Sequence, residues 1–379
     1  MKYKLLIDCS IICKGRHLCS LDYYAIHLIK GFKDSEVFDV TAIVRKGMES
    51  YFDDLTGLNV PKIIVDEHSH VTRWPAVDKL LGLIPFKKEL IKRNIDIVLT
   101  PYHFDCRFFF PKKYHQHAVV HDLIPYYVQK GMMGKFRYLV WRIYLNLLIR
   151  KIPNYIAISE ETRKDLYKFE RKDSVVVHNS LVFDFSIKEK EIEIVCDRPY
   201  ILDVNCFNKH KNAETLIRAF ALISGKIPHM LYLKGDRNYE KQCEYYKELA
   251  TKLHVQNRII FDQSYRPVEE MRYLYTHADL FVSPSLIEGF GWTPIEAAVL
   301  KVPVLVSNTD IFKEITCGKV PTFNPYSPGD IAEKMLNFLH NPPKTVELEK
   351  IADFFVKRYS IKQQICKMEA VLLSKLDMR

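Results

Sequence analysis

The sequence predicts an α/β protein made of two Rossmann-like, doubly wound domains. Short apolar runs of strand length alternate with helical segments along nearly the whole chain, the pattern of parallel sheets covered by helices. The chain has 379 residues, more than the ~250 to 300 at which one hydrophobic core stops growing. Its apolar content of 48% is sufficient to fill two cores. We therefore expect one domain in each half.

The first domain is expected to span residues 1–183. The opening residues 1–8 are too short and too soon interrupted by charge to form a signal peptide, so we interpret them as a first buried strand. A helix is expected from Leu21. The apolar runs that predict the strands of this sheet are residues 4–7, 39–44, 62–65, 95–100, 118–120, 155–158 and 174–177.

Residues 184–197 have mixed charge and little periodicity, so we expect them to link the domains. The second domain, residues 198–358, repeats the alternation, and a final segment, residues 359–379, is predicted to be helical from Ile361 onward. Predicted strands at 200–204, 230–234, 258–261, 279–282 and 302–306 are separated by predicted helices at 213–223, 239–253, 267–277 and 294–300.

Positive charge is concentrated in the first domain. The formal net charge is +10, and residues 1–183 hold 29 Lys and Arg against 20 Asp and Glu. This excess suggests an anionic acceptor or an anionic membrane surface as a partner. The segment 135–151 interleaves basic, aromatic and aliphatic residues, so it is either a packed core helix or a helix that contacts a membrane. No helix-turn-helix, zinc-finger or RNA-recognition signature is present, so no nucleic-acid partner is expected.

The cysteines indicate a reducing compartment. Nine are scattered along the chain without a regular framework, which is typical of free thiols and predicts a cytoplasmic location. Cys9, Cys13, His17 and Cys19 fit no usual zinc spacing, so no metal site is predicted. No run approaches the ~18 apolar residues of a membrane-spanning helix. Membrane contact, if made, is expected to be peripheral, at the inner face of the cytoplasmic membrane.

Two glutamates, Glu288 and Glu296, are separated by seven residues. Glu288 follows the predicted strand 279–282, so it is expected at the carboxyl edge of a sheet, where open α/β folds bind ligands. Gly289 and Gly291 let the backbone pass close to a ligand, and the helix start beyond them presents N–H groups and a positive dipole to a phosphate. This segment predicts a nucleotide-sugar site. The other residues expected at the donor are Phe290, Gly291, Trp292 and Thr293.

A structural interpretation of Glu296 stands beside the functional one. Thr293 and Glu296 have the spacing of a capping box, with Pro294 at the first helical position, where its missing N–H costs nothing. Glu296 is then either a ligand contact or a helix cap. Glu288 fits no such cap, because it follows a strand and precedes a glycine turn.

Four more positions are candidates for the site. Lys211 lies in the strand-to-helix loop 208–212, where it can donate to a diphosphate together with the helix N-terminus; the alternative is an ordinary solvent-exposed lysine. His210 precedes it. His121 ends an apolar strand, where a lone histidine is more often structural. Gly15, in the loop after the first strand, is typical of a turn and is also compatible with acceptor or phosphate contact.

These motifs resemble the retaining glycosyltransferases of the GT-B fold, the large bacterial family that includes mannosyl-, glucosyl- and rhamnosyltransferases. The two-glutamate motif lies in the segment 279–320, which resembles the signature region of that family. Other segments resemble the family in the same order along the chain, namely residues 119–125, 156–166, 177–180, 200–204 and 211–220.

The resemblance implies a GT-B fold, with two Rossmann-like domains facing one another across a cleft and the final helix packing back on the first domain. It implies a retaining hexosyltransferase that moves a hexose from a nucleotide-diphosphate sugar to a glycan or lipid-linked acceptor. The implied setting is the synthesis of cell-surface polysaccharide or lipopolysaccharide. The nucleotide sugar is a substrate, so no cofactor is expected. No metal is expected either, because the chain lacks the Asp-x-Asp motif of the other large glycosyltransferase fold.

The resemblance also implies roles for individual residues. Lys211 and the helix N-terminus after Gly291 stabilise the departing diphosphate, Glu288 holds sugar hydroxyls, and Glu296 holds the ribose. His121 faces the donor sugar, where it can donate a hydrogen bond or stabilise developing charge. The diphosphate itself is the implied base that takes the proton of the acceptor hydroxyl.

Two other classes of protein remain open. One is a non-hydrolysing nucleotide-sugar epimerase on the same double-Rossmann plan, which predicts product without an acceptor. The other is a catalytically silent GT-B scaffold protein, which predicts nucleotide binding without turnover. The sequence leaves the nucleotide base, the sugar and the acceptor undecided.

Overall fold

The computed structural model describes residues 2–15, 17–65, 89–103, 112–127, 136, 138–139, 143, 152–181, 187–192, 198–205 and 207–376. The chain divides into two compact units. Unit 1 is Met1–Val182 together with Tyr359–Arg379, and unit 2 is Phe183–Arg358.

Unit 1 contains a parallel sheet in the order β3-β2-β1-β4-β5-β6-β7 among the described residues. Its strands are apolar on both faces, as expected for a sheet covered by helices: Leu5, Leu6 and Ile7 of β1 are fully buried. Every strand predicted for this half is present, with bounds shifted by at most two residues. The strands are β1 (Tyr3–Asp8), β2 (Phe38–Arg45), β3 (Lys62–Val65), β4 (Ile97–Thr100), β5 (Gln116–Val120), β6 (Asn154–Ala157) and β7 (Val175–Val176).

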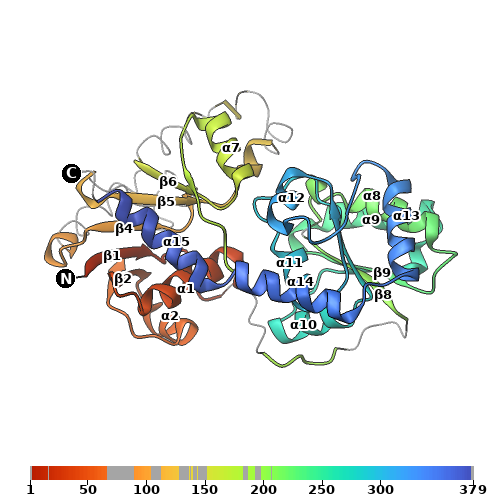
Figure 1. Cartoon of the computed structure of the whole chain (residues 1–379), viewed down its shortest axis with the longest axis horizontal. Helices are drawn as coiled ribbons and strands as arrows, with labels where there is room; N and C mark the ends of the chain where they lie inside the picture. The colour runs from red at the N-terminus through yellow and green to blue at the C-terminus, as the bar shows by residue number, and fades with distance from the viewer. Residues whose placement is uncertain are drawn as a thin grey trace. The chain divides into compact units, whose positions relative to one another are not determined.

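The C-terminal helix of the chain belongs to unit 1 and packs against its first helix (Figure 1). Gly31 permits the close approach, because a methyl group added there would lie 2.3 Å from Cγ1 of Ile365. The Ser35 hydroxyl donates a hydrogen bond to Glu369 of the same terminal helix. The helices of unit 1 among the described residues are α1 (Ser20–Lys33), α2 (Glu49–Thr56), α7 (Glu160–Glu170) and α15 (Ile361–Ser374).

Unit 2 contains a second parallel sheet, in the order β10-β9-β8-β11-β12-β13. The five strands predicted from the sequence are present. The sixth, β13, was missed because two residues between Pro321 and Asn324 give no periodic pattern. The strands are β8 (Tyr200–Val204), β9 (Met230–Lys234), β10 (Ile259–Asp262), β11 (Leu280–Ser283), β12 (Val304–Ser307) and β13 (Thr322–Phe323).

The helices of unit 2 follow its strands in sequence, and α8 and α13 contribute to a core with buried side chains such as Leu216, Phe220 and Met335. Four helices match the predicted ones within two residues, and the others had no prediction. They are α8 (Ala213–Ile223), α9 (Glu240–Lys252), α10 (Val268–Thr276), α11 (Trp292–Val299), α12 (Asp310–Thr316), α13 (Pro328–His340) and α14 (Thr345–Arg358).

Two predictions fall largely outside the described residues. Of the expected linker 184–197, the structure describes residues 187–192. Of the segment 135–151, it describes four residues, and the large apolar side chains among them, Phe136, Leu139 and Ile143, are exposed. Within the described parts of the chain, no helix is both long enough and apolar enough to span a membrane.

Candidate functional site

An ion pair lies at the point in unit 2 where the strand order reverses. Lys211 follows β8 and Glu288 follows β11, and these two strands are neighbours at the centre of the sheet. The Lys211 Nζ lies 2.6 Å from Glu288 Oε1, and 18% and 12% of the two side chains are exposed. Open α/β sheets bind ligands outside the carboxyl ends of strands at such a switch point. Two residues that the sequence singled out, 77 positions apart, are therefore in direct contact.

The loop that carries Lys211 is held by Asn212. This residue adopts a left-handed backbone conformation with φ 59°, which asparagine tolerates better than most residues. Its buried side-chain amide donates to the carbonyls of Pro284 (3.1 Å) and Pro325 (2.8 Å). The Leu286 N–H donates to the His210 carbonyl at 2.8 Å. The loops after β8 and β11 are thus tied together at the site.

The glycine turn after Glu288 leads into the N-terminus of α11. The helix begins at Trp292, with Gly291 as its N-cap at φ 87°. A methyl group at Gly291 would lie 2.9 Å from the Phe312 ring, so both the backbone conformation and the packing require glycine. The capping-box interpretation of Thr293 and Glu296 is wrong, because the helix starts before Thr293.

Glu296 lies on the second turn of α11 instead. Its carboxylate accepts a hydrogen bond from the Tyr275 hydroxyl at 3.1 Å. Burial raises the pKa of Glu296 to about 7, and the Tyr275 hydrogen bond opposes only part of that rise. A half-buried carboxyl that titrates near neutral pH is typical of a ligand site rather than of a helix cap.

A second buried carboxyl at the site, Asp203, had no sequence prediction. It lies on β8 and is 1% exposed. Burial raises its pKa to about 8, although a hydrogen bond from Asn205 and the charge of Lys211 oppose the rise. Asp203 is therefore largely protonated at neutral pH, which leaves Glu288 as the carboxylate partner of Lys211. The sequence signal that could have identified Asp203 is an acidic residue within the otherwise apolar strand 200–204.

His210 stays neutral at physiological pH. Burial and the adjacent charge of Lys211 lower the pKa of His210 to about 4. The positive charge beside Glu288 therefore comes from Lys211 and not from this histidine.

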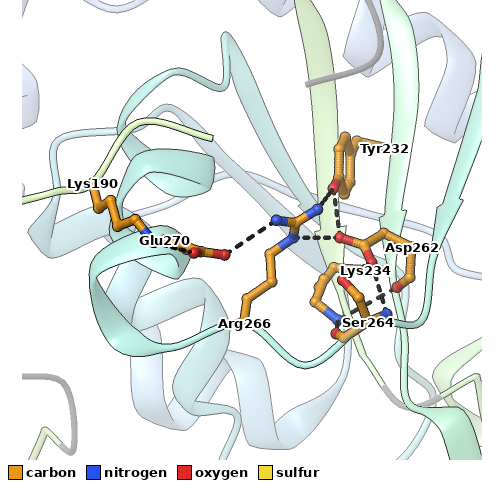
Figure 2. Close-up of polar contacts among 7 residues, drawn as sticks. All are labelled: Lys190, Tyr232, Lys234, Asp262, Ser264, Arg266 and Glu270. Carbon is orange, nitrogen blue, oxygen red and sulfur yellow. Dashed lines mark hydrogen bonds and ion pairs between the residues drawn. The ribbon is translucent and has the colours of Figure 1, made fainter. Parts of the chain in front are cut away.

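A polar network joins β9, the end of β10 and the segment that follows it (Figure 2). The Asp262 carboxylate accepts from the Tyr232 hydroxyl and from Arg266 Nε, both at 2.6 Å. Burial alone would raise the pKa of Asp262, but hydrogen bonds from Ser264, Tyr232 and Arg266 lower it to about 2. Arg266 also forms an ion pair with Glu270, with 3.3 Å between Nη1 and Oε2.

The same network reaches the segment 187–192. Lys190 Nζ lies 3.1 Å from Glu270, and its backbone N–H donates to the Glu269 carbonyl. The buried Lys234 ammonium donates to the carbonyls of Gly235 (2.9 Å) and Ser264 (2.6 Å). The alternating charges thus hold the loop after β10 in one arrangement. The pairs Lys190–Glu270 and Lys234–Ser264 join residues distant in the sequence, so no local pattern predicts them.

The remaining predicted residues lie in unit 1. His121 follows β5, is 4% exposed, and its Nε2 lies 2.8 Å from the Pro101 carbonyl. A carbonyl only accepts, so Nε2 carries the proton. Burial lowers the pKa of His121 to about 4, so the ring is neutral and cannot act as a cation. Gly15 is exposed in the loop after β1 with φ 96°, and a Cβ there would meet nothing within 4 Å.

No metal-binding cluster is present in the described parts of the chain. Across them, no group of three or more His, Cys, Asp or Glu side chains is placed to hold a metal ion. The donor set at the switch point, one lysine with buried carboxyls, is suited to an anionic ligand that also carries hydroxyl groups.

The chain is similar to known glycosyl transferases. Residues 184–353 match the family described as glycosyl transferases group 1. The O-antigen chain mannosyltransferase RfbU of Salmonella typhimurium is 26% identical over 309 residues, covering 80% of this chain and 82% of that protein.

Two solved structures share the fold over nearly the whole chain. Sucrose-phosphate synthase of Thermosynechococcus elongatus has a TM-score of 0.70 at 16% identity and covers 99% of this chain and 100% of its own. Anabaena HepE in complex with UDP-glucose has a TM-score of 0.69 at 14% identity, with coverage of 97% and 99%.

The fold and the relatives define the class of protein. The chain has the GT-B fold, with one Rossmann-like sheet in each unit, and the predicted fold class is confirmed. The family match and the mannosyltransferase relative support a glycosyltransferase that acts in polysaccharide synthesis. The resemblance to GT-B glycosyltransferases stated from the motifs is confirmed as well.

Proposed function

We propose that the chain is a retaining, metal-independent glycosyltransferase that moves a hexose from a nucleotide-diphosphate sugar to a glycan or lipid-linked acceptor. The observation that carries this proposal is the Lys211–Glu288 pair, 2.6 Å apart at the switch point of unit 2. The relative named as a mannosyltransferase favours mannose as the hexose. The UDP-glucose complex of HepE supports a nucleotide sugar as the donor.

The Lys211–Glu288 pair is suited to breaking the bond between the sugar and the diphosphate. A lysine ammonium has three N–H donors, so Lys211 can keep its contact with Glu288 and still donate to a phosphate oxygen. The N-terminus of α11 adds partial positive charge at the same edge of the sheet. Negative charge develops on the diphosphate as the sugar leaves, so both groups stabilise the transition state more than the ground state. They supply the positive charge that a metal ion provides in other transferases.

The carboxyl groups are suited to hold the hydroxyl groups of the donor. Glu288 accepts from the hexose, and its charge is balanced by Lys211, so it does not repel the neighbouring diphosphate. Glu296, with a pKa of about 7, accepts from or donates to the ribose. The acceptor hydroxyl then attacks from the face that the diphosphate leaves, and a diphosphate oxygen takes its proton, which retains the anomeric configuration.

The acceptor side of the proposal rests on charge and exposure. Residues 1–183 carry most of the positive excess, which suits an anionic acceptor or membrane surface. The exposed Phe136, Leu139 and Ile143 are spaced as on one face of a helix. These features support peripheral contact with a membrane that carries a lipid-linked acceptor.

Thermal stabilisation by a panel of nucleotide sugars tests the donor site. GDP-mannose, UDP-glucose, dTDP-rhamnose and ADP-glucose are each added without metal to the wild type, to Lys211→Ala and to Glu296→Gln. A rise in Tm with one nucleotide that is reduced in both variants supports the donor site and identifies the base. No rise with any donor, or an equal rise in the variants, overturns the assignment. A non-hydrolysing epimerase would be recognised instead by product formed from the nucleotide sugar without an acceptor.

A further inference from the structure

A cavity opens in unit 2 beside the loop that carries Lys211. It has a volume of about 550 Å³ and lies between the start of α8 and the first two turns of α9. Small-molecule sites commonly enclose ~300 to 1,000 Å³, so the cavity has room for one or two sugar rings. Neither lysine nor glutamate of the switch-point pair lines it.

An anchored tyrosine forms one wall. The Tyr245 hydroxyl donates to Glu214 Oε2 at 2.9 Å, while Arg218 Nη2 donates to Oε1 of the same carboxylate at 2.9 Å. The ring is therefore fixed at its hydroxyl end, yet 41% of the residue stays exposed. The ring of Tyr246, 1% exposed, supports it at a centroid distance of 5.7 Å. A fixed, accessible aromatic ring costs little conformational entropy when it binds a ligand.

The other walls are polar. Thr215 donates to Asn212 Oδ1 at 2.6 Å, and the Asn212 amide is bound to two carbonyls, so this wall is rigid. Gln242 from α9 adds an amide that can both donate and accept. Lys209 is exposed at the rim. The lining thus offers hydroxyl, amide, carboxylate and ammonium groups around an aromatic ring.

This chemistry selects among ligand classes. Burial alone would raise the pKa of Glu214, but hydrogen bonds from Arg218 and Tyr245 lower it below its usual range. The carboxylate is therefore ionised at neutral pH, and its negative charge disfavours a phosphorylated ligand in this cavity. The polar lining disfavours an apolar ligand. A saccharide fits, because its hydroxyls both donate and accept while its C–H face packs on an aromatic ring.

We propose that this cavity is a carbohydrate-binding site, distinct from the donor site, that holds one or two sugar residues against Tyr245. Such a site gives the protein a second hold on a glycan chain. The site itself stands independently of the proposed function; only the use of a mannoside among the probes rests on it.

Saturation-transfer NMR tests the site with three probes: methyl α-mannobioside, maltose and lactose. Each is added to the full chain with saturating GDP and UDP, so that the donor site is filled. We expect saturation transfer to at least one disaccharide, and an affinity that falls about tenfold or more in Tyr245→Ala. Tyr245→Phe keeps the ring and is expected to retain most of the binding. Tyr167→Ala, at an exposed tyrosine on α7, is the matched control and is expected to bind as the wild type does.

The outcomes separate this proposal from the proposed function. Binding of maltose or lactose that depends on Tyr245 supports the site even if no mannosyl transfer occurs. Nucleotide stabilisation that is unchanged in Tyr245→Ala supports its separation from the donor site. No saturation transfer to any of the three disaccharides, or wild-type binding in Tyr245→Ala, overturns the proposal.

Discussion

Replacing Glu296 by glutamine is expected to make the ligand-free protein more stable at alkaline pH and no more stable at acidic pH. Burial raises the pKa of this carboxyl to about 7, whereas an unfolded chain has a glutamate pKa of ~4.3. Between these pH values the native protein holds a proton that the unfolded chain has released. The free energy of unfolding therefore falls as the pH rises through this window.

The size of the effect follows from the pKa difference. Each pKa unit corresponds to ~1.36 kcal/mol, so the full shift lowers the free energy of unfolding by at most ~3.7 kcal/mol above pH 7. Because Glu296 keeps partial exposure, we expect about 2 to 3 kcal/mol. Glutamine has no charge to desolvate and removes this cost. For a unit of the size of Phe183–Arg358, the gain corresponds to a Tm increase of roughly 5 to 10 °C.

Calorimetric melting of the ligand-free protein at about pH 4 and about pH 8.5 measures this difference. Glu333→Gln, at an exposed glutamate on α13, is the matched control and is expected to change Tm equally at both pH values. Glu296→Gln should also weaken nucleotide binding, because the side chain is proposed to hold the ribose. The same Tm change for Glu296→Gln at both pH values, or a lower Tm at about pH 8.5, would refute the reasoning.

Three further predictions concern the same unit. Lys211→Ala is expected to weaken nucleotide binding about 10- to 100-fold in calorimetric titrations, through loss of a charge-assisted hydrogen bond; Lys226→Ala, at an exposed lysine after α8, should leave it unchanged. Gly291→Ala is expected to lower the free energy of unfolding by about 2 to 3 kcal/mol in denaturant titrations, because the φ of Gly291 is 87° and an added methyl group would lie 2.9 Å from the Phe312 ring. The control Gly225→Ala, with open space around the glycine, should leave the stability almost unchanged. Equal losses of stability in the two variants would contradict the packing argument. Asp262→Asn is expected to lower the free energy of unfolding by about 2 kcal/mol at pH 7, because the pKa of about 2 lies below the unfolded value of ~3.9. The difference in stability between wild type and variant should shrink as the pH falls from about 4 to about 2, and a difference that stays constant would contradict the reasoning.

The sequence predicted the elements that local pattern determines. Strands such as β8 and β9 match their predicted bounds because buried parallel strands are continuous apolar runs between polar loops. The rule that ligands bind beyond strand ends then predicted Glu288 and Lys211 as site residues. Both positions follow from short-range signals, and the structure brings them into contact.

Other features depend on neighbours distant in the sequence. The capping box of Thr293 was a correct spacing on a helix that begins elsewhere, because the left-handed Gly291 starts the helix at Trp292. Asp203 was not predicted as a site residue, because its raised pKa results from burial in the folded protein. The ion pairs of Arg266 with Asp262 and Glu270 have a local spacing of four residues, whereas the contacts of Tyr232 with Asp262 and of Lys190 with Glu270 join distant segments that no local pattern encodes.

A direct transfer assay tests the central claim. The donor that raises Tm is incubated with a saccharide or lipid-linked acceptor, and NMR identifies the new glycosidic bond and its anomeric configuration. The proposed function predicts a product that keeps the configuration of the donor and forms at a greatly reduced rate in Lys211→Ala. An inverted product, an epimer formed without acceptor, or undiminished transfer in Lys211→Ala would contradict it.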